Sequence, residues 1–167
     1  YLGLGGYAVA IFSFYEIDNG YLQLLAAILG SAAVAFVIGA ITLRTSGLYF
    51  IMITLAFTQM LFFLGISLEE YGGDDGLPTN RSEFFEALDL YEPYIFYYLC
   101  FALLALCVFL CYRIVNSRFG MVIRASHSNE TRMQAVGFST YWYKLTAFTI
   151  AGAMCGISGF LLANQTE

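Results

Sequence analysis

The sequence predicts an all-α integral membrane protein, a bundle of transmembrane helices. Its mean hydropathy is +0.73 and only 11% of its 167 residues are charged, which is far too apolar for a soluble domain of this length. Several uncharged stretches also reach about 20 residues, the length at which a helix crosses a hydrocarbon core. A membrane β-barrel would show segments of alternating polarity, whereas IMITLAFTQMLFFLGISL is apolar on every side.

Five apolar stretches account for the predicted helices. Residues 2–15 are too short to span alone, and because the chain starts at Tyr1 without a basic leader, we interpret them as the end of a truncated span. The four full spans are residues 21–43, 47–68, 93–115 and 145–163. Pro93 opens one of them, at a position where its missing N–H does no harm. The chain is therefore expected to be one transmembrane domain, a fragment lacking both ends.

Basic residues predict the orientation, because short loops rich in Lys and Arg stay in the cytoplasm. With alternating spans, only Arg81 falls on the side opposite to the other basic residues. The others are Arg44, Arg113, Arg118, Arg124, Arg132 and Lys144. Residues 116–144 are therefore expected to form a cytoplasmic segment and residues 69–92 an extracytoplasmic loop. The acidic residues fall mostly outside, and they explain the net charge of -5 without a cationic partner.

Cysteine and glycine patterns do not indicate a cofactor or a metal. Cys100, Cys107 and Cys111 share one helical face, but no His or carboxylate lies on that span, and buried Cys commonly behaves as a small hydrophobe. LGLGG follows no strand, and GGDDG at 72–76 lacks the alternating ligands of an EF-hand. We therefore predict neither a cofactor nor a metal site.

Small residues recur at four-residue spacing in two spans. They are Ala26, Gly30, Ser31, Ala35 and Gly39 in the first full span and Gly152, Gly156 and Gly159 in the last. Such faces let helix backbones approach closely in lipid, where no hydrophobic drive acts between helices. The alternative is that Gly and Ala are simply common in membrane helices. We expect these two spans to pack together.

Three polar residues, Thr54, Thr58 and Gln59, lie near the middle of the 47–68 span. An amide facing lipid would leave donors and acceptors unpaired, so Gln59 is expected to face protein or water. Both an interhelical hydrogen bond and the wall of a polar substrate pathway are consistent with this position. No ionisable side chain lies in the core of a span, which disfavours a proton relay or a voltage sensor.

Residues 116–144 carry helix signals. Ser126 or Ser128 is a predicted N-cap for a short helix from Asn129 to Val136, and Gly137 can supply its C′ residue. A helix this short is unstable alone and needs a docking partner. The alternative is a simple loop that lies on anionic headgroups through its arginines.

Three stretches of the sequence are distinctive: LRTSGLYFIMITLAFTQML, GGDDGLP and SRFGMVIRASHSNETRMQAVGFSTYWYKLTAFTIAGAMCGISGFLLA. They resemble the LivM-type permease subunits of branched-chain amino-acid ABC transporters. The matching positions in the last stretch are Ser117, Phe119, Gly120, Arg124, Asn129, Glu130, Ala135, Gly137, Tyr143, Lys144, Ala147 and Phe148. His127 and Ser128 depart from the family, which usually has a basic and an acidic residue there. The resemblance runs over nearly the whole chain.

This resemblance implies an importer of branched-chain or related small amino acids in a bacterial-type cytoplasmic (inner) membrane. It implies a heterodimer with a related permease subunit, two ATP-binding subunits and an extracytoplasmic substrate-binding protein, and no nucleic acid. In that family the SRFG-to-YK region contacts the ATPase, so residues 129–136 would act as a coupling helix. The implied coupling residues are Arg124, Asn129, Glu130, Arg132 and Gly137. ATP hydrolysis is expected in the partner, since this chain has no P-loop pattern.

Three other functions stay open. One is a urea or short-amide permease of the same superfamily, which the sequence hardly separates from an amino-acid permease. Another is a membrane scaffold without transport, which would tolerate loss of the short helix. A membrane enzyme is disfavoured, because catalytic groups would have to converge near one interface, and His127 is the single histidine beside spans without charge.

Overall fold

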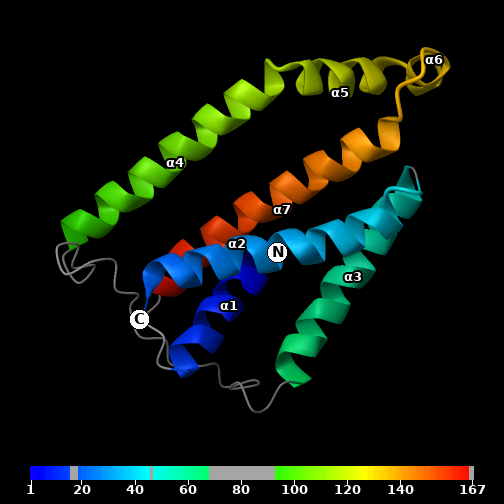
Figure 1. The fold of residues 1–167 in the computed structure, drawn as a ribbon. Helices are drawn as coiled ribbons and strands as arrows, with labels where there is room; N and C mark the ends of the chain where they lie inside the picture. Colours follow the sequence, from blue (N-terminus) through cyan, green and yellow to red (C-terminus); the bar gives the residue numbers. More distant parts are fainter. Residues whose placement is uncertain (16–18, 46, 68–92, 166–167) are drawn as a thin grey trace.

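The computed structural model describes residues 1–15, 19–45, 47–67 and 93–165, and this part of the chain is helical without a strand. Its helices are α1 Leu2–Phe14, α2 Gly20–Thr42, α3 Leu48–Ser67, α4 Pro93–Val115, α5 Arg118–Ser128, α6 Glu130–Ala135 and α7 Thr140–Gln165 (Figure 1). Four of them, α2, α3, α4 and α7, are long and apolar enough to cross a membrane. The predicted fold class, an all-α membrane bundle, is therefore confirmed.

Two differences from the sequence prediction lie in and beside the polar segment. Helix α7 begins at Thr140 instead of Leu145, because the aromatic and basic residues before Leu145 continue its backbone hydrogen bonding. Residues 118–128, expected only as part of a polar segment, form the separate helix α5. The predicted loop 69–92, with Arg81 and the GGDDG turn, lies outside the described residues.

Helices α1, α2 and α7 form the packed core. Each contributes a side chain that is at most 1% exposed, namely Val9, Ala27 and Phe160, and these three side chains lie in one cluster. Helix α3 has no buried residue, and α4 runs along the outside of the bundle, reaching the cluster only through Phe96 and Leu99 (Figure 1). The core is therefore a three-helix assembly with two more spans at its edge.

Small residues bring α2 and α7 together, as predicted. A Cβ added at Gly152 would lie 2.3 Å from the Ala35 Cβ, and one added at Gly156 would lie 2.1 Å from the Ser31 Oγ. A Cβ added at Gly39 would lie 2.8 Å from the Phe148 ring and 3.0 Å from the Leu145 side chain, both of α7. Side chains larger than hydrogen at these glycines would hold the two backbones apart.

The other half of the predicted stripe does not reach α7. Gly30 is exposed, and a Cβ there would meet nothing within 4 Å, while Ala27 is fully buried and its carbonyl lies beneath Gly156. The stripe that packs on α7 runs through Ala27, Ser31 and Ala35. The sequence did not identify Ala27, because Ala26 and Gly30 show the same four-residue spacing. Sequence spacing fixes the period of a helical face, whereas the rotation of the helix against its neighbours decides which face is used.

Helix α1 crosses α7 through a second glycine contact. A Cβ at Gly159 would lie 2.1 Å from the Leu2 carbonyl oxygen, and a Cβ at Gly5 would lie 2.5 Å from the Gly156 carbonyl oxygen. Gly159, predicted to join the seam with α2, therefore packs against α1. The rings of Tyr1 and Phe148 meet edge to face at 5.9 Å, about a third of the way along α7. Helix α1 thus covers only part of the length of its neighbour.

The alternation of the spans brings their basic ends to one end of the bundle. The last turns of α2 and α4, the first turns of α3 and α7, and both short helices gather there (Figure 1). Tyr141 near the start of α7 donates a hydrogen bond to the Ala40 carbonyl at 2.8 Å, which joins the core helices at this end. The six basic residues used to predict the orientation all lie in these elements or next to them.

We expect Gly156→Ala to lower the stability of the bundle, because its Cβ would meet the Ser31 hydroxyl and the Ala27 carbonyl. Overpacking of this kind typically costs about 1–3 kcal/mol. The matched control is Gly30→Ala, on the exposed face of α2 that does not contact α7. This change should be neutral or slightly stabilising, since Ala is the better helix former. Thermal unfolding in detergent measures both. Equal melting temperatures for the two variants would contradict the glycine seam.

Candidate functional site

Two regions could carry function: the polar segment between α4 and α7, and a cavity beside α3. The segment begins with a corner between α4 and α5. The Ser117 hydroxyl donates to the Ile114 carbonyl at 2.6 Å and accepts from the Gly120 N–H at 3.4 Å, which caps α5. A Cβ at Gly120 would lie 2.3 Å from the Val115 carbonyl oxygen. Only glycine allows α5 to turn so tightly out of α4.

Arg124 strengthens this corner. Its guanidinium donates a hydrogen bond to the Val115 carbonyl at 2.5 Å, across nine residues of chain. The last carbonyls of a helix lack partners within the helix and carry partial negative charge, so a cation is favourable there. Arg124, expected from the resemblance to couple to an ATPase, thus has a contact within its own chain, at the end of α4.

The short helix α6 begins at Glu130, one residue later than predicted, and it has a different N-cap. Asn129 is extended, with φ -157° and ψ 99°, and its Oδ1 accepts a hydrogen bond from the Arg132 N–H at 2.9 Å. The predicted caps Ser126 and Ser128 are wrong because both lie within α5, where their hydroxyls donate to carbonyls of the preceding turn.

Gly137 ends α6 as predicted. Its φ of +97° lies in the left-handed region that favours glycine. The Gly137 N–H donates to the Gln134 carbonyl at 2.9 Å, and the Phe138 N–H donates to the Met133 carbonyl at 3.1 Å. These two bonds make a Schellman motif, which satisfies the last carbonyls of the helix.

Glu130, the first residue of α6, is bound to the start of α7. Its Oε1 accepts one hydrogen bond from the Lys144 ammonium at 2.6 Å and another from the Thr140 hydroxyl at 3.0 Å. Thr140 is only 2% exposed and in turn accepts from the Gln134 amide at 3.3 Å. We call the side chains of Glu130, Gln134, Thr140 and Lys144 the α6–α7 clamp. The hydrogen bond from Lys144 lowers the pKa of the Glu130 carboxyl, an effect that burial partly opposes and Thr140 reinforces.

Aromatic rings hold α5 against the same part of the chain. Tyr143 in the first turn of α7 lies between Phe119 of α5, with ring centroids 5.5 Å apart, and Phe138 after α6, at 6.4 Å. The three rings fill the angle between the helices. Both short helices are therefore seated on α7, and their geometry is fixed within this chain.

A second set of side chains in the segment faces outward. Val136 is 67% exposed and Met121 is 55% exposed, although both are apolar. The Arg132 guanidinium is exposed and has no ion-pair partner among the residues that the structure describes. This mixture of exposed apolar groups and a cation is available to a partner.

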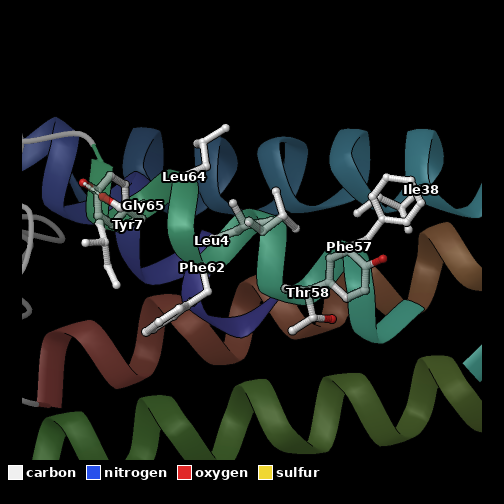
Figure 2. A pocket seen from close by; sticks show the side chains of 12 residues that line it. Leu4, Tyr7, Ile38, Phe57, Thr58, Phe62, Leu64 and Gly65 are labelled. Atoms are coloured by element: carbon white, nitrogen blue, oxygen red, sulfur yellow. Dashed lines mark hydrogen bonds between the residues drawn. The ribbon is translucent and has the colours of Figure 1, made fainter. Parts of the chain in front are cut away.

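A cavity of about 380 Å³ lies between α3 and the core helices α1 and α2 (Figure 2). It is lined by Tyr1, Gly3, Leu4, Tyr7, Ile38, Phe57, Thr58, Leu61, Phe62, Leu64, Gly65 and Ile66. Its walls are apolar apart from three hydroxyl groups and backbone. The Tyr7 hydroxyl donates to the Gly65 carbonyl at 3.2 Å and so joins α1 to α3 across the outer end of the cavity.

Only one of the three polar residues predicted for a pathway lines this cavity. Thr58 does, and its hydroxyl donates to the Thr54 carbonyl at 2.8 Å. Thr54 donates to the carbonyls of Phe50 and Ile51 and lies outside the lining. Gln59 is exposed on a different face of α3, one residue further round the helix.

The second cavity, of about 540 Å³, separates α4 from α7. Cys100 and Cys107 line it together with Met154, and the Cys111 thiol lies 3.7 Å from the Met154 sulfur. The shared face predicted for these cysteines is thus the one turned toward α7. Its lining is mainly apolar, with the hydroxyl groups of Tyr97 and Ser158 and without a charged group.

Two buried amides were missed by the sequence analysis. Gln23 of α2 is fully buried and Asn164 of α7 is 2% exposed, at the end of the bundle away from the short helices. The Asn164 side chain donates to the Phe160 carbonyl at 2.9 Å. The sequence contains the signal that could have found them, because any amide in an apolar helix requires hydrogen-bond partners. The prediction used this argument only for Gln59.

Comparison with known proteins gives one family. A family model described as the branched-chain amino acid transport system / permease component matches residues 1–167. Two curated relatives, from Salmonella typhimurium and Escherichia coli, are high-affinity branched-chain amino acid transport system permease proteins LivM, and each is 31% identical to the chain. The match covers 98% of this chain and 46% of each relative, so the chain spans about half their length. No solved structure matches it.

We expect Asn129→Ala to loosen α6, because it removes the acceptor for the Arg132 N–H. Loss of an N-cap costs about 1 kcal/mol, so protection of the α6 amides from hydrogen exchange should fall roughly fivefold. Asn129→Asp keeps the acceptor and should retain protection. The control is Ser128→Ala, which should change little; if it loosened α6 as much as Asn129→Ala does, the assigned cap would be wrong.

The clamp should depend on pH through Glu130. Its pKa is lowered in the folded chain, so the stabilisation by the ionised carboxylate is complete above the ordinary glutamate pKa and is lost as the pH falls through the lowered value. Carbon-13 NMR of labelled glutamate carboxyl groups should show this low midpoint. Lys144→Met should raise the midpoint and Lys144→Arg should keep it low; identical midpoints in all three proteins would refute the ion pair.

Proposed function

The chain belongs to the family of branched-chain amino acid transport system permease components, and from this premise we propose that it is part of the permease subunit of an ABC importer. The subunit lies in a bacterial-type inner membrane as a multi-pass protein. It moves branched-chain or related small amino acids inward. Hydrolysis of ATP takes place in partner subunits that bind the end of the bundle formed by α5 and α6.

The observation that carries this proposal is the construction of the segment between α4 and α7. Two short helices are fixed to two spans by contacts within the chain, through Arg124 on one side and the α6–α7 clamp on the other. Exposed apolar groups and Arg132 remain on the outside. The segment is thus fixed to the spans on its membrane side and exposed on its opposite side. This arrangement suits the transmission of force from a docked partner to the spans.

The proposed partners follow from the family: a related permease subunit as heterodimer, two ATP-binding subunits and an extracytoplasmic binding protein. Closure of the ATP-binding subunits displaces α6, and the attached spans α4 and α7 change between outward-facing and inward-facing arrangements. Binding of ATP does work only if the ATP-binding subunits bind the two arrangements with different affinity. The ATP-binding subunits sense the two arrangements at α6, whose ends are defined by Asn129 and Gly137. Arg132 of this helix contacts the partner.

We place the substrate pathway beside α3, along Thr54, Thr58 and Gln59. The cavity that contains Thr58 supports this position, because its aliphatic and aromatic walls suit a branched aliphatic side chain. The same walls are less suited to urea or a short amide, which would leave hydrogen-bonding groups unpaired. An amino-acid substrate is therefore the better supported of the two. Neither a scaffold nor an enzyme explains both the braced segment and the cavity.

Uptake by the full-length subunit, reconstituted with its partners, tests the pathway. Thr58→Trp would fill the cavity and should raise KM for isoleucine uptake roughly tenfold or more, since loss of a well-packed aliphatic contact is worth about 1–3 kcal/mol. Gln59→Leu should also raise KM if its amide faces the pathway in the assembled transporter. Met52→Trp is the control, because Met52 is exposed and outside the cavity. Unchanged KM in both pathway variants would exclude α3 from the route.

A further inference from the structure

Helix α6 has only six residues, too few to be stable on its own. Its caps, Asn129 and the turn at Gly137, set where it begins and ends, but they do not fix its position against the rest of the chain. That position depends on what its side chains contact. The shortest such contact joins Glu130 to Lys144 at 2.6 Å, and Glu130 also bonds Thr140, both in the first turns of α7.

Lys144 and Glu130 form a surface ion pair, with side chains 36% and 46% exposed, and further hydrogen bonds add to it. An isolated exposed pair contributes little, because water competes with it and two long side chains lose freedom. Here the same carboxylate oxygen also accepts from Thr140, which is almost fully buried, and Thr140 accepts from Gln134 one turn further along α6. Two residues of α6 are therefore held at one point of α7, which restricts rotation as well as translation.

The other short helix is braced differently. Ser117, Gly120 and Arg124 fix α5 to the end of α4. Between α5 and α6 the only chain connection is the single extended residue Asn129. The corner at Ser117 thus joins α5 to α4, and the clamp joins α6 to α7. The Tyr143 ring cluster, made of Phe119, Phe138 and Tyr143, also seats α5 on α7.

We propose that Lys144 and Thr140 are positioning residues that act through Glu130 to make α6 and the start of α7 move as one body. In this assignment, which rests on the proposed function, Glu130 works inside its own chain, whereas Arg132 on the same helix meets the ATP-binding partner. The resemblance had placed both residues at the partner contact. A push on α6 reaches α7 directly through the clamp.

The first test measures position and needs no partner. Spin labels are placed at Thr131 on α6 and Thr146 on α7, both exposed, in the full-length subunit in lipid nanodiscs, with the native cysteines replaced. The distance distribution should be narrow in the parent and broad in Lys144→Glu. It should narrow again when Glu130→Lys is combined with Lys144→Glu, and it should stay narrow in Lys144→Arg. An unchanged distribution in Lys144→Glu, or no recovery in the double variant, would overturn the proposal.

The second test measures coupling in the reconstituted transporter. Lys144→Glu should lower the substrate moved per ATP hydrolysed by roughly fivefold or more, while the affinity for the ATP-binding subunits stays unchanged. The double charge exchange should recover most of the coupling. Arg132→Glu should instead weaken binding of the ATP-binding subunits, and no change at Lys144 should rescue it.

The two tests separate the failure of this inference from that of the proposed function. If the parent transporter showed no ATP-driven uptake, the proposed function would fail, while the spin-label distances would still decide the clamp. If the parent transported and Lys144→Glu lowered partner binding as Arg132→Glu does, Glu130 and Lys144 would belong to the partner contact and the positioning role would be refuted.

Discussion

Close approach of helix backbones at Gly5, Gly152, Gly156 and Gly159 is the constraint on which the rest of the structure depends. Lipid offers no hydrophobic drive for helices to associate, so their packing relies on short-range contact between complementary surfaces. The missing Cβ atoms let α1 and α2 reach the α7 backbone. Because α7 is the shared surface, its position determines where α6, the clamp and the Tyr143 ring cluster can lie.

In the segment between α4 and α7, several polar residues hold the short helices in position through contacts within the chain. Ser117, Arg124 and Glu130 each find a partner within the chain. These bonds leave Val136 and Arg132 facing outward. A family motif of this kind therefore mixes residues that build the surface with residues that present it, and a list of motif positions does not separate them.

The two cavities differ in what they offer. The one beside α3 adjoins the core and is lined by hydroxyl groups from Tyr1, Tyr7 and Thr58. The one between α4 and α7 has the hydroxyl groups of Tyr97 and Ser158 among apolar side chains and thiols, and its lining is less polar. Hydroxyl groups that already donate to helix carbonyls, as Thr58 does, still offer oxygen lone pairs to a ligand. The more polar lining and the contact with the core are the physical reasons for the proposal that a substrate passes beside α3.

The sequence by itself determined the spans, their alternation, the presence of α6 and its end at Gly137, and the association of α2 with α7. Those features follow from hydropathy, local backbone preference and the spacing of small residues. Tertiary structure decided that Ala27 and not Gly30 meets α7, that α5 is a separate helix, that Thr58 but not Gln59 lines a cavity, and that Glu130 binds Lys144. The reason is that each outcome depends on how one helix is rotated against another, and a periodic sequence permits several rotations, whereas packing allows only one.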